Sequence, residues 1–401
     1  MGYPQHRYGF EALRQPATTA RVADHEIHTH GAYLNTQKTA IWQRDTMRQS
    51  FRWHFCPAHD FASISDRWQK LCDASVKSPL LSSEFIAGCL QHFAKGEELV
   101  CIGEGTDGPI AATILQRRGR FLWETFQPSQ MPIGPWMQAA GLNFDQVQAS
   151  LLRALPKWAM MLGTTSIDPM FVPKPNTTTS VSLDSITTGE IDLPESFDGY
   201  MNSLDAKHVA GMYRRLRKTE REIGAVTRTT KTDVVDVEDF VQLYADLESR
   251  GWKGRVGTAL KPGDHQSAFY ADLLKSFAAK GQAKMFVLRF DSRPVAAQIA
   301  IASGTRMYLL KTTFDPDFRN LGPGVLLHHQ VTTHCFEEPR KYRRIELYGP
   351  LNDSQKMWIT GKRVIFHVNS YRSSAVAKLH RHLIGLKRQK ASVETTPASG
   401  K

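Results

Sequence analysis

The feature of this sequence that most constrains its fold is an internal duplication, because a chain that repeats one pattern builds related structural units. Two stretches, DGPIAATILQRRGRFLWETFQPSQMPIGPWM from Asp107 and DSRPVAAQIAIASGTRMYLLKTTFDPDFRNLGPGVLL from Asp291, share one order of features. Each has an acidic turn, Pro-aliphatic-Ala-Ala, a strand, a tight turn, an aromatic-rich strand and a proline-bearing loop with Gly-Pro. Pro294 stands 185 residues after Pro109. We expect one unit to occur twice, each copy continuing into a helix and a short strand; the alternative is two unrelated sheets with similar hairpins.

The loop of the second copy has the composition of a phosphate site. It reads RNLGPG and lies between the apolar stretch TRMYLLKTTF and a predicted helix. The start of a helix leaves backbone N–H groups unpaired and carries a partial positive charge, so it attracts phosphate. Gly322 and Gly324 would let a ligand approach the backbone, Pro323 suits a first helical turn, and Arg319 could grip a pyrophosphate. The alternative is an ordinary strand-to-helix turn.

The two copies differ in this loop. Counted from its own Gly-Pro, the first copy has Met131, Gly134 and Trp136 where the second has Arg319, Gly322 and Gly324. An indole would fill the space that a phosphate needs. We therefore predict a nucleotide site in the second copy and a closed site in the first.

Helical and strand-like patterns alternate along the chain, which indicates a mixed α/β fold. Two predicted helices, 63–76 and 82–95, begin with a serine in the N-cap position. Further helices are predicted over 143–162, 196–224, a stretch ending near 251, 266–281 and 375–390. The predicted strands cover 98–104, 109–116, 120–126, 164–172, 283–314 (three strands with tight turns) and 342–350.

The second half resembles a known family. The loop from Arg319 to Gly324 matches the R/Q-x-x-G-x-G/A coenzyme A loop of the GNAT acetyltransferases. Four segments in order, ESRGWKGRVGTAL, RPVAAQIAI, KTTFDPDFRNLGPGVLL and LYGPLNDSQKMW, resemble the CelD-like acetyltransferases of bacterial exopolysaccharide loci. Those proteins are related to FemAB-type transferases, which carry tandem GNAT units. The resemblance covers about residues 190 to 375, and the first half matches only as a weak repeat.

The resemblance implies tandem GNAT-like units, each a mixed, mostly antiparallel sheet flanked by helices. We predict a loosely ordered arm at 1–55, a degenerate unit at 56–190, the catalytic unit at 191–375, and a basic helix with a disordered tail at 376–401. It also implies acyl transfer from acetyl-CoA, or a related acyl-CoA, by direct attack of an amine or hydroxyl on the thioester. The predicted coenzyme contacts are Leu310 and Lys311 on the strand, where a backbone N–H would meet the thioester carbonyl, and Arg319, Asn320, Leu321, Gly322, Gly324 and Val325 in the loop.

Such a reaction needs an acid for the thiolate and a base for the acceptor. Tyr348 follows the strand after the coenzyme helix, where this fold often places its acid, and Glu346 and Asp315 are the candidate bases. Alternatively, Tyr348 is a packed aromatic, Glu346 is an ion-pair partner for Arg343, and Asp315 is a turn residue before proline. The predicted acceptor contacts are Trp252, Lys253 and Arg255 in a glycine-rich loop, with Lys356 and Trp358 after the last core strand.

Composition bears on location and partners. The chain has no run of about 18 apolar residues, no signal peptide, and five scattered cysteines, which together predict a reducing cytoplasm. A formal net charge of +12 favours anionic partners, or a basic surface kept for solubility. The C-terminal helix could contact an anionic membrane surface or pack on the domain edge. No RNA-binding motif and no metal site are predicted, and the histidines at 328, 329 and 334 are expected in the core or on the surface.

Two other functions remain open at this level. One is a FemX-like transferase that uses aminoacyl-tRNA, which the positive charge would suit through phosphate contacts. The other is a non-catalytic GNAT-fold binding platform. The intact Arg319–Gly324 loop favours the acyl-CoA enzyme over the aminoacyl-tRNA transferase.

Overall fold

The computed structural model describes residues 52–175, 177, 180–255, 257, 259–337 and 342–382, and of Trp252 and Lys253 the backbone alone. The predicted arm lies outside these residues except for 52–55, which belong to the first strand. Of the predicted C-terminal helix, the residues up to 382 are described, and these are helical.

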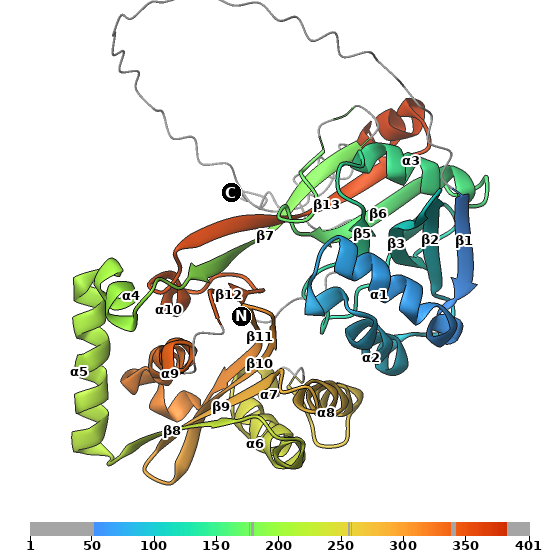
Figure 1. The fold of residues 1–401 in the computed structure, drawn as a ribbon. Coiled ribbons are helices and arrows are strands. Elements are labelled where there is room, and N and C mark those ends of the chain that lie inside the picture. The colour runs from blue at the N-terminus through green and yellow to red at the C-terminus, as the bar shows by residue number, and fades with distance from the viewer. Residues whose placement is uncertain are drawn as a thin grey trace, which may run out of the picture. The chain divides into compact units, whose positions relative to one another are not determined.

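A single sheet runs through the described part of the chain (Figure 1). Its strand order is β1-β2-β3-β4-β6-β13-β7-β12-β11-β10-β9-β8, with β5 paired to β3. The strands are β1 Arg52–Pro57, β2 Leu99–Gly105, β3 Gly108–Arg117, β4 Leu122–Thr125, β5 Trp136–Gln138, β6 Met161–Ile167, β7 Ser180–Asp192, β8 Val226–Lys231, β9 Ala283–Phe290, β10 Arg293–Ser303, β11 Arg306–Phe314, β12 Arg344–Leu347 and β13 Gly361–Tyr371.

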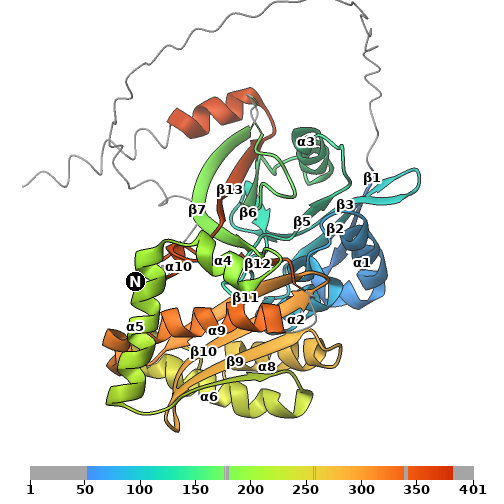
Figure 2. The same cartoon turned by 60° about the vertical axis from the view of Figure 1, so that its left-hand side comes forward.

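Helices flank this sheet (Figures 1 and 2). The α-helices are α1 Ser65–Ala74, α2 Ser83–Phe93, α3 Phe144–Ala154, α4 Phe197–Ser203, α5 Ala206–Glu222, α6 Val237–Arg250, α7 Trp252–Arg255, α8 His265–Ala278, α9 Pro323–Glu337 and α10 Asp353–Lys356. Short 3-10 helices are η1 Ala58–Ile64, η2 Pro79–Leu81, η3 Val234–Asp236 and η4 Pro316–Leu321. The predicted mixed, mostly antiparallel sheet with flanking helices is confirmed. Among the described helices, none has the length and apolar composition needed to cross a bilayer.

The two halves of the chain use the same pairing order. In the first half β4 pairs in parallel with β6, and in the second β11 pairs in parallel with β12. The next strand in space comes from the other half: β13 pairs with β6, and β7 pairs with β12. Because β7 and β13 also pair with each other, this exchange joins both halves into one sheet.

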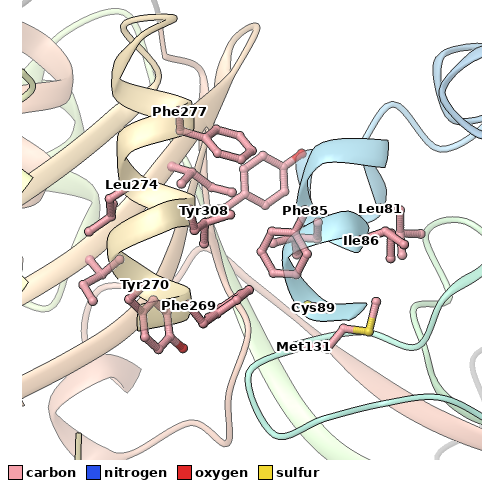
Figure 3. Close-up of a cluster of buried hydrophobic side chains, with 14 of the residues drawn as sticks. Leu81, Phe85, Ile86, Cys89, Met131, Phe269, Tyr270, Leu274, Phe277 and Tyr308 are labelled. Carbon is pink, nitrogen blue, oxygen red and sulfur yellow. The ribbon is translucent and has the colours of Figure 1, made fainter. Parts of the chain in front are cut away.

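The largest hydrophobic cluster also spans both halves. Side chains of α2 face side chains of α8, and the rings of Phe85 and Phe269 lie 5.9 Å apart, edge to face (Figure 3). Two further clusters lie under α9 and under α3. Burying aromatic surface between α2 and α8 stabilises the contact between the halves beyond their shared strands.

Three helix predictions need correction. The helix predicted over 143–162 ends at Ala154, and residues 161 and 162 belong to strand β6. The helix predicted over 196–224 divides into α4 and α5, because the Asp205 side chain accepts a hydrogen bond from the His208 N–H at 3.0 Å and caps a new helix. Ser82 caps α2 as predicted. No serine side chain caps α1, which continues directly from η1.

The first copy departs from the predicted pattern after its Gly-Pro. Trp136 begins strand β5, pairs with Thr113 of β3, and is 3% exposed in the cluster under α3. The helix α3 begins only at Phe144. The predicted helix and short strand do follow in this copy, as α3 and β6, but the strand β5, which was not predicted, comes before them. Trp136 is a core residue of a strand, whereas Gly324 lies in the first turn of a helix, so the two are not structural counterparts.

Candidate functional site

The loop after β11 turns through a left-handed glycine. Asp315 caps η4 by accepting a hydrogen bond from the Asp317 N–H at 3.1 Å. The 3-10 helix ends at Gly322, whose φ of 67° lies in the region that favours glycine. Helix α9 starts at the next residue, Pro323. The predicted order of strand, glycine turn and helix is confirmed.

Gly324 has no reason within the described chain to be glycine. Its φ is outside the left-handed region, and a Cβ built on it meets no atom within 4 Å. Its N–H has no backbone acceptor among the described residues, whereas the N–H groups of Val325 and Leu326 donate to the Gly322 carbonyl. Glycine inside a helix costs about 1 kcal/mol relative to alanine. The open side and the unpaired amide leave room for a ligand here, and the coenzyme contact of Gly324 stays a prediction.

The other predicted loop residues divide into two groups. Arg319 and Asn320 are exposed and can present their side chains to a ligand. Leu321 and Val325 are 7% and 9% exposed and pack in the cluster under α9. These two could contact a ligand only through their backbone.

The sheet opens between β11 and β12 beside this loop. β12 pairs with β11 only as far as Leu309 opposite Leu347, although β11 continues to Phe314. On its other side, β11 pairs with β10 at Leu309 and again at Lys311, and Leu310 is left out of the register as a bulge. Within the described strands, residues 310–314 have no partner on the β12 side. Backbone groups at Leu310 therefore lie at a break in the sheet, and their contact with a thioester carbonyl stays a prediction.

The side chain of Lys311 is committed to a buried ion pair. Its Nζ lies 3.0 Å from both carboxylate oxygens of Glu248, which is 2% exposed on α6. Glu248 also accepts the Leu260 N–H at 2.9 Å, which closes the loop after α6. Glu248 was not among the predicted site residues; its place four residues after Tyr244, on the buried face of α6, was the available signal.

A buried charge network holds the two residues that were predicted as acid and base. The Tyr348 hydroxyl donates to Asp168 Oδ2 at 2.7 Å, and Arg363 Nε donates to both Asp168 oxygens at 2.9 and 3.0 Å. A second nitrogen of Arg363 lies 2.9 Å from Glu346 Oε2, and a third donates to Glu190 at 2.9 Å. Asp168 and Glu346 have fully buried side chains. The network joins both halves, because Asp168 follows β6 and Arg363 lies on β13.

Burial dominates the ionisation of these groups. It raises the pKa of Tyr348 well above its usual value, and the negative charge of Asp168 raises it further. Burial also raises the pKa of Glu346, although the charge of Arg363 acts in the opposite direction. Tyr348 therefore keeps its proton, which points at Asp168. The structure places Tyr348 and Glu346 on one face around Arg363, and their roles as acid and base stay predictions.

Asp315 lies apart from this network. Arg293 donates to its Oδ2 at 2.8 Å and Arg250 at 3.1 Å. Burial alone would raise the pKa of Asp315, but the Asp317 N–H and the two guanidinium groups outweigh it and hold the pKa below its usual value. A carboxylate stabilised in this way is a weak base. Its geometry favours the alternative of a structural turn residue, and the catalytic role stays a prediction.

The predicted acceptor residues are not gathered in one place by the described side chains. Arg255 is exposed on α7, next to Trp252 and Lys253, whose side chains lie outside the description. Lys356 is exposed and forms an ion pair within its own short helix. Trp358 is fully buried in the cluster under α9, so this conformation offers its indole to no acceptor.

Trp358 packs against two buried histidines of α9. His328 and His329 are 6% and 5% exposed, and their rings lie 5.5 and 6.4 Å from the Trp358 ring. Burial lowers the pKa of each to about 4. Both are therefore neutral core residues at pH 7, which is one of the two placements predicted for them.

We expect the free energy of unfolding to fall as the pH drops from 6.5 towards 4. The unfolded chain protonates these histidines near their ordinary pKa of 6.5, whereas the folded chain does so only near 4, so acid favours the unfolded state. The loss at pH 5 is about 2 kcal/mol per histidine by this linkage. Urea unfolding at pH 7 and pH 5 measures it. His328→Leu should make the free energy of unfolding less dependent on pH, whereas His265→Gln, at an exposed position, should not. Equal pH dependence in the wild type and both variants would contradict the conclusion that the buried histidines are neutral.

Comparison with known proteins bears on this geometry. Residues 206–355 match the sequence family described as acetyltransferase (GNAT) domain, a range that holds the bulge, the glycine loop and α9. This part of the chain therefore matches a GNAT domain in sequence and has a GNAT-like fold. No curated protein sequence matches the chain.

Solved structures resemble the chain over most of its length. FemX is 11% identical with a TM-score of 0.51, covering 79% of this chain and 98% of FemX. L-PGS from Bacillus licheniformis is 12% identical with a TM-score of 0.48, covering 77% and 92% of the two chains. A tandem GNAT protein from the clavulanic acid biosynthesis pathway is 13% identical with a TM-score of 0.46, covering 80% and 99%. At this identity, the likeness to FemX concerns the fold alone.

Proposed function

We propose that this protein is an acyl-CoA-dependent acyltransferase that moves an acetyl group to an amine or hydroxyl of a saccharide acceptor. The observations that carry the proposal are the bulge at Leu310, where β11 and β12 separate, and the glycine turn that leads from the same strand into α9, where the Gly324 amide has no backbone acceptor among the described residues. The GNAT match over 206–355 supports it. The saccharide class rests on the resemblance of four sequence segments to CelD-like enzymes.

The residues of the site fit the parts of an acyl-CoA. The Gly324 amide, the start of α9 and the Arg319 side chain would hold the pyrophosphate. Acyl-CoA supplies an activated thioester, and backbone N–H groups near Leu310 would stabilise negative charge on its carbonyl oxygen. Positioning supplies most of the catalysis in a direct transfer of this kind.

Proton transfer is the least complete part of the site. In the proposal Tyr348 supplies a proton, and because its hydroxyl now donates to Asp168, it must turn away from Asp168 to do so. Glu346 and Asp315 are held by arginines, so a base for the acceptor would have to work from an ion pair.

The test is calorimetric titration of acetyl-CoA into the purified full chain. We expect saturable binding with a stoichiometry of one per chain, since the first copy has no counterpart of the glycine loop. A thiol-reactive dye should then detect free coenzyme A when amino sugars, hydroxyl-bearing saccharides or simple amines are added. If acetyl-CoA, longer acyl-CoAs and free coenzyme A all fail to bind, the proposal is wrong. The aminoacyl-tRNA transferase and the binding platform would then be tested.

A further inference from the structure

Helix α5 brings an arginine onto the glycine loop from a different part of the sequence. α5 lies beside α9 (Figure 2) and contacts η4. A Cβ built on Gly322 would lie 2.8 Å from Arg215 Cδ and 3.0 Å from its Nε. The stem of Arg215 thus occupies the space that the missing side chain of Gly322 leaves, so Gly322 is needed for close approach as well as for its φ.

The face of α5 that carries Arg215 is fixed by packing. Met212 and Thr219 are fully buried on the inner side of the helix. The ring of Tyr213 contacts the ring of His329 on α9, with centroids 6.0 Å apart. These contacts hold α5 on α9, so Arg215 is presented to the loop by a defined element and not by a freely rotating segment.

Among the described residues, the Arg215 guanidinium has no anionic partner. No carboxylate among the described residues lies within ion-pair distance of Arg215 or of Arg319, whereas Lys218 and Arg221 of α5 both pair with Glu222. Arg215 and Arg319 are both exposed, and the stem of Arg215 lies against Gly322, two residues before the Gly324 amide that has no backbone acceptor among the described residues. Two arginines and a backbone amide around one loop are donors of the kind that bind a phosphate dianion.

We infer that Arg215 is the second cation of the phosphate site for coenzyme A. This rests on the proposed function. The ligand group is a phosphate of the nucleotide end, either the pyrophosphate on the loop or the ribose 3′-phosphate beyond it. Arg215 lies far from Arg319 in sequence and outside the R-x-x-G-x-G pattern, so the loop motif does not reveal it.

The experiment compares two ligands and three proteins by calorimetry. The ligands are coenzyme A and 3′-dephospho-coenzyme A, and the proteins are the full-length wild type, Arg215→Ala and Arg217→Ala. Arg217 is an exposed arginine on the same helix, and two residues turn the helix by about 200°, so it is a matched control on the opposite face. We expect Arg215→Ala to weaken coenzyme A binding at least tenfold and Arg217→Ala to change it less than twofold.

The second ligand identifies the phosphate. If Arg215 binds the 3′-phosphate, the wild type should bind 3′-dephospho-coenzyme A as weakly as Arg215→Ala binds coenzyme A. If it binds the pyrophosphate, Arg215→Ala should weaken both ligands equally. Equal affinity of wild type and Arg215→Ala for coenzyme A, with both folded by circular dichroism, overturns the inference and leaves the proposed function standing. Absence of binding by the wild type to either ligand overturns both.

Discussion

Replacing Gly324 by tryptophan should abolish acetyl-CoA binding, with a loss of affinity of more than 100-fold, and should leave the protein folded. A Cβ built at this position meets no atom of another part of the described chain within 4 Å, so a larger side chain starts into open space and we expect the fold to accommodate it. It would project over the unpaired amide at the start of α9 and fill the space that a pyrophosphate needs. Replacing glycine in a helical turn also removes a residue of low helix propensity. Calorimetry with acetyl-CoA and thermal unfolding followed by circular dichroism measure both effects.

Gly119 offers a matched control for this substitution. It lies in the hairpin between β3 and β4, its φ is outside the left-handed region, and a Cβ on it also meets nothing within 4 Å. Gly119→Trp should therefore bind acetyl-CoA like the wild type. If Gly324→Trp binds acetyl-CoA with unchanged affinity, the coenzyme does not lie on this loop.

Local signals in the sequence were sufficient for the part of the fold around the loop. The strands β9, β10 and β11 follow from apolar runs with tight turns, and Gly322 was predicted as a turn residue before a helix. Helix α8 has an Asp264 cap before it and Gly281, with a φ of 67°, after it. Each of these features depends on residues a few positions apart.

The exchange of β7 and β13 could not be predicted in the same way. Neither strand was predicted, although VSLDSITTGEID alternates partly between apolar and polar residues. Their pairing joins segments about 180 residues apart, and nothing local in a sequence specifies which distant strand is the partner. The sheet therefore became visible only with the structure.

The same reason explains which site residues were missed. Tyr348, Glu346 and the glycine loop lie in one short region with a recognisable order. The contacts of Asp168 and Arg363 around Tyr348 exist only because the two halves share strands. In the sequence, Asp168 is simply an aspartate before a proline, and Arg363 lies in a segment for which no element was predicted. Predicting them would have required the pairing of β13 with β6.

Arg363→Met should lower the free energy of unfolding at pH 7 by about 3–5 kcal/mol. Arg363 is the shared partner of Asp168, Glu346 and Glu190, and the first two have fully buried side chains. Methionine keeps much of the volume and removes the charge, so Asp168 loses its cation and, among the described residues, Glu346 keeps only the more distant Arg306, 3.9 Å away. Removing one partner from a buried ion pair costs more than the pair contributes, because the remaining charge stays in a medium that solvates it poorly. Urea unfolding followed by fluorescence measures the change.

The pH dependence separates this cause from a simple loss of packing. Buried carboxylates without a cation bind protons more tightly in the folded variant than in its unfolded chain, so acid stabilises the folded state relative to the unfolded one. The deficit of Arg363→Met relative to the wild type should therefore shrink between pH 7 and pH 5, even though acid destabilises both proteins through the buried histidines. Arg343→Met is the matched control, since Arg343 is 69% exposed and its carboxylate partner 83% exposed, and it should cost no more than about 0.5 kcal/mol. A deficit for Arg363→Met that stays constant with pH would show that lost packing, and not the uncompensated charge, determines it.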